Sequence, residues 1–216
     1  MFKGKVLLFS LLLGLLLATS LYAGDVDNCQ SEVYLSTTPM RVSICPQGDF
    51  EEIYTGGGGT SDYIRVIARD SGGNGIPGIP WTDYWIQACD AGEELCLCAQ
   101  PIVADSLTNE NGETTISGRI AGGGCALNGV YIAIQGRTIV ESPSCVDPVC
   151  LNMVIVSPDL NADCYVNLSD FGIFATSYNT TQGDSDFDTC CDYNDDNICD
   201  LSDFGFFGEH YQHQCF

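Results

Sequence analysis

Positive charge is what this sequence has least of. Its 216 residues include 7 lysines and arginines against 29 aspartates and glutamates, a formal net charge of −22. The lysines, Lys3 and Lys5, are both near the N-terminus, so the chain beyond residue 23 has five arginines against 29 acids, a net charge of −24. Such a chain repels phosphate backbones and anionic lipids, which excludes nucleic acid and anionic membrane surfaces as partners. The same charge favours divalent cations.

Long apolar runs are also scarce, and the longest covers residues 6–18. It follows Lys3 and Lys5 and leads into small residues that end at Ala23, the pattern of a secretory signal peptide. The run is short for a membrane span. We therefore expect residues 1–23 to be a cleaved signal peptide and the protein to be secreted or at the cell surface, without membrane insertion.

Histidine is nearly absent, and this limits the catalytic options. His210 and His213 both lie near the C-terminus beside Cys215. They could build a transition-metal site, but we expect an exposed pair on a terminal helix. Glycoside hydrolysis needs two carboxylates in one cleft, and nothing in the sequence brings Glu51–Glu52 and Glu93–Glu94 together. We expect no enzyme activity, with a small glycan-active enzyme as an alternative.

Cysteine, in contrast, is abundant, with 13 residues that all lie beyond residue 23. In an exported chain this density indicates disulfide bonds. Eight lie from Cys29 to Cys150 and five from Cys164 onward, so at least one thiol is free or pairs outside its own segment. Cys96 and Cys98 are spaced like a metal-binding pair, but disulfides are favoured. The pairing itself does not follow from the sequence.

Residues 25–156 show short alternating apolar runs separated by turn residues, and no helical period. Such spacing predicts a mainly β fold, an antiparallel β-sandwich. The glycine runs at 56–59 and 122–124 are predicted loops, because neither has the following helix and lysine of a phosphate-binding loop. The predicted strands are Val33–Leu35, Arg41–Cys45, Tyr63–Arg69, Asp83–Ala88, Glu113–Ser117, Val130–Ile134, Thr138–Glu141 and Asn152–Val156.

Two turn motifs refine this prediction. A D-x-x-x-x-G-x-P turn follows one predicted strand, and a T-x-x-x-G-x-T segment comes later; their residues are Asp70, Gly75, Pro77, Thr108, Gly112 and Thr114. This order resembles bacterial immunoglobulin-like domains of the invasin or intimin type. The resemblance implies an immunoglobulin-like β-sandwich over residues 25–156. Trp81, Tyr84 and Trp85 could offer a polysaccharide an aromatic platform, although packing on the sandwich is the simpler explanation.

One twelve-residue pattern occurs twice near the C-terminus, DLNADCYVNLSD at 159–170 and DYNDDNICDLSD at 192–203. Each copy has Asp or Asn at positions 1, 3, 5, 9 and 12 and a backbone carbonyl at position 7, the ligand spacing of an EF-hand calcium loop. The sequence therefore predicts two Ca²⁺ ions. Their ligands are Asp159, Asn161, Asp163, Tyr165 (carbonyl), Asn167 and Asp170 in the first loop, and Asp192, Asn194, Asp196, Ile198 (carbonyl), Asp200 and Asp203 in the second.

The residue before Pro158 is disfavoured in helical conformation, so no helix enters the first loop and each unit is loop–helix. A duplicated loop–helix calcium unit resembles the type I dockerin family, over residues 158–216. The resemblance implies a small α-helical, EF-hand-type module that attaches its protein to a cohesin-like or other extracellular scaffold protein, in assemblies linked to polysaccharide degradation. Position 6, usually glycine, is Cys164 and Asn197 here, and cysteine suits left-handed geometry poorly.

Apolar residues recur along both expected helices at i, i+3 and i+7, and we expect the two faces to pack together as a minimal core stabilised by calcium and disulfides. These residues are Phe171, Phe174 and Tyr178 in one helix and Phe204, Phe207 and Tyr211 in the other. The leading hypothesis is a secreted, non-catalytic protein whose calcium module mediates attachment. The alternative is a structural or adhesive surface protein whose calcium module packs on its own sandwich.

Overall fold

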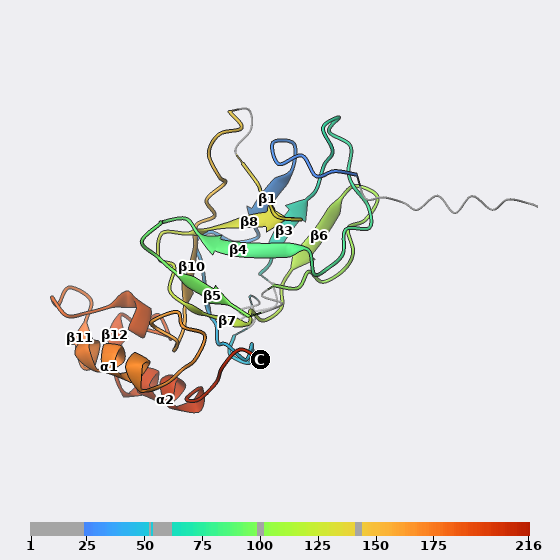
Figure 1. Cartoon of the computed structure of the whole chain (residues 1–216). Helices are drawn as coiled ribbons and strands as arrows, with labels where there is room; N and C mark the ends of the chain where they lie inside the picture. The colour runs from blue at the N-terminus through green and yellow to red at the C-terminus, as the bar shows by residue number, and fades with distance from the viewer. Residues whose placement is uncertain (1–23, 52, 54–61, 99–101, 141–143) are drawn as a thin grey trace, which may run out of the picture.

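Figure 1 shows the computed structural model, which describes residues 24–51, 53, 62–98, 102–140 and 144–216. The expected signal peptide, the 56–59 glycine run and Glu52 lie outside these ranges. The described chain is mainly β, as predicted, with α-helices α1 (Leu168–Ser177) and α2 (Leu201–Glu209) and a 3₁₀ turn, η1 (Thr189–Cys191). Within those ranges, neither helix is long and apolar enough to span a membrane.

Two three-stranded antiparallel sheets form most of the β part. One has the order β1–β3–β6 and the other β4–β8–β9. In β3, Ile64 and Val66 are buried and Arg65 is exposed, as the alternating sequence predicted. Inward residues of both sheets share one core. The strands are β1 (Glu32–Leu35), β3 (Ile64–Ile67), β6 (Glu113–Ile116), β4 (Tyr84–Ala88), β8 (Val130–Ile134) and β9 (Arg137–Thr138).

Two further strand pairs correct the sequence prediction. β2 (Met40–Ser43) and β10 (Met153–Val156) pair in parallel, so the expectation of a wholly antiparallel arrangement was wrong. β5 (Leu95–Leu97) pairs with β7 (Gly122–Gly124), so the 122–124 glycine run is a buried strand rather than a loop. Glycines form this strand because other chain segments approach where side chains would stand.

The turn residues of the immunoglobulin-like motifs are fixed by close backbone contacts. A Cβ on Gly75 would lie 2.2 Å from the Asn111 carbonyl carbon, and Gly112 adopts a left-handed φ of +77°. The Thr108 hydroxyl donates to the Ile76 carbonyl at 2.7 Å and accepts from the Ile79 amide. These motifs therefore hold two turns against each other. The immunoglobulin-like assignment itself stays a prediction.

A smaller helical part follows β10, at the lower left of Figure 1. α1 and α2 are joined through the short pair β11 (Thr180–Thr181) and β12 (Ile198–Cys199). Its core combines Phe174, Phe207 and Tyr193 with Val156 of β10, and Phe50 of the β part packs against it. The C-terminal tail returns to the β part near β7 (Figure 1). The helical part is thus packed on the β part through a shared core.

Five cysteine pairs lie at disulfide distance. Two are within the β part, Cys29–Cys145 and Cys89–Cys150. Three join it to the helical part, Cys96–Cys164, Cys98–Cys215 and Cys125–Cys190. The expectations that at least one thiol is free or pairs outside its own segment, and that Cys96 and Cys98 form disulfides, are confirmed. This many disulfides indicates an oxidising environment.

Candidate functional site

The first predicted loop is organised by backbone amides that converge on its carboxylates. The Asp159 side chain accepts from the amides of Asp163 at 3.1 Å and Cys164 at 2.9 Å. Asp170 accepts from the amides of Asn161 at 3.1 Å and Asn167 at 2.8 Å. Asp159, Asp163 and Asp170 each offer an oxygen within 4.8 Å of the others. Twelve residues thus close around three carboxylates.

The second loop repeats this arrangement. Asp192 accepts from the amides of Asp196 at 3.1 Å and Asn197 at 3.0 Å, as Asp159 does in the first loop. Asp203 accepts from the amides of Tyr193 at 2.8 Å and Asp200 at 2.9 Å. Among the described residues, however, the equivalent carboxylates of this loop, Asp192, Asp196 and Asp203, are not grouped within the 4.8 Å found in the first. The folds of the two loops match, and their carboxylate spacing differs.

Each loop ends by capping the helix that follows. Asn167 and Asp200 are the N-cap residues, and their side chains accept from the amides of Ser169 and Ser202, both at 2.7 Å. Asp170 and Asp203 complete capping boxes at the third helical position. These contacts fix positions 9 and 12 of each loop to a rigid element. The predicted ligand positions are therefore held by helix geometry.

The remaining predicted ligands also lie on the loops. Asn161 and Asn194 donate through their side-chain amides to Asp163 at 3.0 Å and Asp196 at 2.9 Å. The Tyr165 carbonyl accepts from the Asn167 side chain at 2.9 Å, and the Ile198 side chain points to solvent. The atoms that the predicted ligands would offer to a metal ion are all oxygens, the kind of ligand set that hard divalent cations take.

Burial makes negative charge costly at these positions. Asp159, Asp170 and Asp203 are fully buried and Asp192 nearly so. Burial raises the pKa of Asp159 to about 6, and the charge of Asp170 contributes to the rise. Burial likewise raises the pKa values of Asp170, Asp192 and Asp203. Buried carboxylates of raised pKa in both loops, grouped closely in the first, mark sites whose charge is suited to a cation.

Position 6 is left-handed in both loops, with φ of +68° at Cys164 and +66° at Asn197. Asparagine tolerates this region, whereas cysteine does so at a cost. Cys164 also forms the disulfide to Cys96 of β5. The covalent link to the β part occupies the position at which a calcium loop usually has glycine.

The β part holds the loops through residues that the sequence did not mark. A Cβ on Gly123 would lie 1.9 Å from the Asp159 Oδ2 atom, and the Gly124 amide donates to the Asp159 carbonyl at 2.7 Å. Only a glycine strand allows this approach of loop one. The contact is between segments far apart in the chain, so no local pattern could have indicated it.

Arg41 of β2 holds the second loop in a similar way. Its guanidinium donates to the carbonyls of Thr189, at 3.4 Å, and Asp192, and it lies 3.4 Å from the Asp195 carboxylate. Next to it, the buried Ser43 hydroxyl donates to the Tyr193 carbonyl at 2.9 Å. The start of loop two is therefore built on β2.

The expected helix-on-helix core is only partly present. Phe174 and Phe207 are buried and stacked, with ring centroids 5.7 Å apart. The other four residues expected in it are exposed: Phe171, Tyr178, Phe204 and Tyr211. Their rings still contact one another or the buried pair, as in Phe171–Phe204 at 6.0 Å and Phe174–Phe204 at 6.1 Å between centroids. Tyr193, Val166 and residues of the β part complete the core around Phe174. His210, expected at the surface, is 7 % exposed, because Phe50 of the β part stacks on its ring at 4.2 Å.

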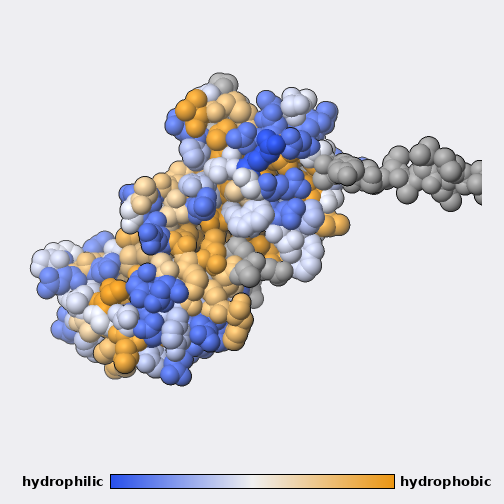
Figure 2. Space-filling model, viewed as in Figure 1, coloured by the Kyte–Doolittle hydropathy of each residue, from blue (hydrophilic) through white to orange (hydrophobic). Residues whose placement is uncertain are grey.

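The exposed aromatic residues form a continuous apolar face on α1 and α2. Leu168 and Leu201, the first residues of the two helices, are 71 % and 68 % exposed. They border two shallow hollows that Phe171 and Phe204 share. Figure 2 shows apolar atoms at the surface of the helical part, among hydrophilic residues. We name Leu168, Phe171, Tyr178, Leu201, Phe204 and Tyr211 the helical face; each of the first three has its counterpart 33 residues later.

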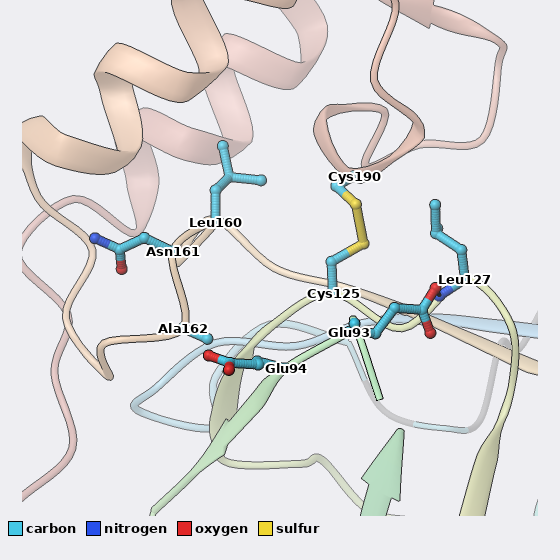
Figure 3. A pocket seen from close by; sticks show the side chains of 9 residues that line it. Glu93, Glu94, Cys125, Leu127, Leu160, Asn161, Ala162 and Cys190 are labelled. Carbon is cyan, nitrogen blue, oxygen red and sulfur yellow. Dashed lines mark hydrogen bonds between the residues drawn. A yellow bond between two sulfur atoms is a disulfide. The ribbon is translucent and has the colours of Figure 1, made fainter. Parts of the chain in front are cut away.

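The acidic pair Glu93–Glu94 lines a pocket between the two parts, beside the Cys125–Cys190 disulfide (Figure 3). The two side chains extend to opposite sides, Glu93 toward Leu127 and Glu94 toward Ala162. Glu93 accepts from the Leu127 amide at 2.9 Å and from the Asn128 amide and side chain. It is tied to a turn, and the arrangement offers no facing carboxylate pair.

No family model and no curated protein matches the chain. Solved structures that match include an N-terminal interface mutant of a type II cohesin–X–dockerin complex from Acetivibrio cellulolyticus, at 16 % identity over 64 % of this chain and 83 % of that one, with a TM-score of 0.27. A C-terminal interface mutant of the same complex matches at 14 % identity over 84 % of this chain and 96 % of that one, with a TM-score of 0.28. Scores this low do not establish a shared fold.

Proposed function

We propose that the protein is a secreted, non-catalytic attachment protein whose two C-terminal loops each bind one Ca²⁺. The support is the donor set: oxygen atoms only, at the spacing of a calcium loop, with two buried carboxylates in each loop and three carboxylates close together in the first. The ligands are those predicted from the sequence, from Asp159 to Asp170 and from Asp192 to Asp203. A bound cation would offset the cost of burying these charged carboxylates, which is the main reason that their pKa values are raised.

The proposal of an attachment role is based on the helical face. It is an exposed apolar surface next to the two cation loops, and its two halves are related by the 33-residue repeat. Exposed apolar patches of this kind mark interaction sites in soluble proteins. Calcium at positions 9 and 12 would stabilise the start of each helix, where Leu168 and Leu201 stand. Calcium binding and partner binding are thereby coupled.

We propose a cohesin-type domain as the partner, in an extracellular or cell-surface assembly. The support is the resemblance of the duplicated loop–helix unit to type I dockerins, over residues 158–216. The LSDFG sequence begins both helices, so a partner could bind the face in two orientations related by a half-turn. The same proposal includes a link between this attachment and extracellular assemblies that degrade polysaccharides.

The test is binding of purified cohesin domains of several types to the immobilised full chain, with calcium and after chelation. We expect calcium-dependent binding that the double variant Leu168→Asp, Leu201→Asp abolishes, while either single variant retains most of it. Tyr34→Asp, an exposed aromatic position on β1, is the control. Calcium-independent binding, or binding unaffected by the double variant, would overturn the proposal.

A structural or adhesive role is the second candidate. Three disulfides and a shared core join the helical part to the β part, an arrangement favouring one rigid surface element. In this case the helical face binds no cohesin, and calcium serves only to stabilise the fold. Failure of every cohesin in the binding test, with calcium bound, favours this candidate.

A further inference from the structure

Four side chains from opposite ends of the chain meet outside the calcium loops. Cys45 and Asp49 follow β2, while His210 and His213 follow α2. One ligand atom of each lies within 4.8 Å of the others. The Cys45 sulfur is 3.2 Å from His213 Nδ1, and an Asp49 oxygen is 3.3 Å from His213 Nδ1 and 3.9 Å from His210 Nε2.

The ring of His210 is fixed in the orientation a metal ligand needs. Its Nδ1 lies 2.8 Å from the Phe206 carbonyl oxygen, which can only accept. In the neutral ring Nδ1 therefore carries the proton, and Nε2, facing Asp49, has a free lone pair. Phe50 stacks on the ring, with centroids 4.2 Å apart. Metal-binding histidines commonly donate their second nitrogen to a carbonyl in this way.

Cys45 is fully buried, and among the described residues it has no disulfide partner. The other two such cysteines, Cys191 and Cys199, are close enough that each thiol shifts the pKa of the other. If those two pair under oxidising conditions, Cys45 is the odd member of the 13 cysteines. Its sulfur faces a histidine and a carboxylate instead of another sulfur.

The disulfide Cys98–Cys215 holds the two halves of this cluster together. Cys215 is two residues after His213, and the Cys98 sulfur lies 2.8 Å from the carbonyl oxygen of Pro46, the residue after Cys45. The Cys45 carbonyl accepts from the amides of Gly48 and Gly122. The cluster is therefore anchored at both ends before any ion binds.

We propose that Cys45, Asp49, His210 and His213 form a tetrahedral Zn²⁺ site. Zinc bonds of about 2.0–2.3 Å in tetrahedral geometry separate neighbouring ligand atoms by roughly 3.3–3.8 Å, close to the three distances in the cluster. One sulfur, two nitrogens and one oxygen suit zinc and not calcium, which takes oxygen alone. On binding, the Cys45 proton passes to solvent, and the thiolate and carboxylate neutralise the ion.

The site is built for a structural ion. Four protein ligands fill a tetrahedral shell and leave no position for a substrate. Asp49 is exposed and opens on a hollow that Glu51 and Glu209 also line, which provides a route for a cation. The ion would fasten the end of α2 to the loop after β2.

Cobalt(II) is the probe, because tetrahedral thiolate-bound cobalt has an intense charge-transfer absorption that oxygen ligands do not give. The full chain is stripped of metal, saturated with calcium and titrated with cobalt. We expect one cobalt per chain with the thiolate band, and its displacement by one equivalent of Zn²⁺. Cys45→Ser abolishes the band and lowers zinc affinity at least about 100-fold, and His213→Gln lowers it by about the same factor.

Glu209→Gln is the matched control, because it removes a negative charge from the rim of the same hollow without touching a ligand. We expect the Glu209→Gln variant to keep the cobalt–thiolate absorption band and an unchanged affinity for zinc. Unchanged calcium binding in each variant shows that the chain still folds. A wild-type chain without the band while its calcium sites are full, or a band that persists in Cys45→Ser, overturns the proposal; the cluster is then a hydrogen-bonded contact in which the Cys45 thiol donates to His213.

Discussion

Gly123 shows how a single missing side chain sets the position of the first cation loop. A Cβ at this residue would lie 1.9 Å from the Asp159 carboxylate. We predict that Gly123→Ala displaces Asp159, lowers calcium affinity at the first loop only, and destabilises the protein by about 1–3 kcal/mol. Calcium titration calorimetry measures the affinities. Gly118→Ala is the control, since nothing lies within 4 Å of its Cβ; equal effects of the two variants would contradict the prediction.

Arg41 has the corresponding role at the second loop. Replacement by alanine leaves the Thr189 and Asp192 carbonyls without their charged donor, and we predict a loss of about 1.5–3 kcal/mol in the free energy of unfolding. The loss appears in denaturant unfolding. Arg65→Ala removes an exposed ion pair with Glu113, which contributes little. If Arg41→Ala costs no more than this control, the second loop does not depend on β2.

The raised pKa of Asp159 gives the metal-free protein a characteristic pH dependence. Between its usual value of 3.8 and about 6, the folded chain binds more protons than the unfolded chain, so stability from this group falls as pH rises. We predict a higher thermal midpoint near pH 5 than near pH 7 without calcium, and calcium affinity that weakens toward pH 5. Asp159→Asn should flatten both dependences; an unchanged dependence in this variant would refute the assignment.

The sequence predicts the ligand positions from their spacing, but it does not indicate the residues that hold the two loops in place. Ligand spacing within twelve residues is a local property, so the amide–carboxylate contacts of Asp159 and Asp170 follow a pattern that can be read directly. Arg41 and Gly123 act across more than 100 and 30 residues of chain respectively. Nothing local distinguishes them from other arginines and glycines.

At the scale of elements, strands with strong alternation were predicted and weakly patterned ones were not. β3 and β8 carry alternating apolar residues and were predicted within a residue or two. β7 consists of three glycines, which have high turn propensity, and becomes a strand only through its pairing with β5. The parallel β2–β10 pair joins distant segments, and the sequence of either segment alone does not indicate the direction of pairing.

The two helices illustrate the limit of periodicity. Their i, i+3, i+7 aromatic residues correctly indicated apolar faces, but only Phe174 and Phe207 are buried. The periodicity could not say whether the partner of each face was the other helix, the β part or another molecule. The β part supplies Phe50, Leu127 and Val154 to the helical core, and this leaves the helical face exposed.

At the scale of the whole molecule, the disulfide map was the least predictable feature. Thirteen cysteines permit many pairings, and three of the five observed pairs join the helical part to the β part. A helical part that was stabilised only by its own minimal core and by calcium would unfold alone when calcium is removed. The shared core and these disulfides change that expectation, because neither part can lose its packing separately.

We predict a single cooperative unfolding transition in scanning calorimetry, with and without calcium. Calcium raises its midpoint, since a ligand at 100 times its dissociation constant stabilises the folded state by about 2.7 kcal/mol per site. Chelation lowers the midpoint and is reversible while the disulfides are intact. Two separate transitions, of which only the smaller responds to calcium, would instead show independently folding parts.

Calcium stoichiometry is the most direct test of the account, since the two loops are its central claim. Titration calorimetry on the full chain, with one equivalent of zinc present to fill any thiolate site, counts the calcium ions bound. We predict two per chain, one per chain in either Asp170→Asn or Asp203→Asn, and none in the double variant. Fewer than two in the wild type, or a count unchanged by these substitutions, would contradict the account.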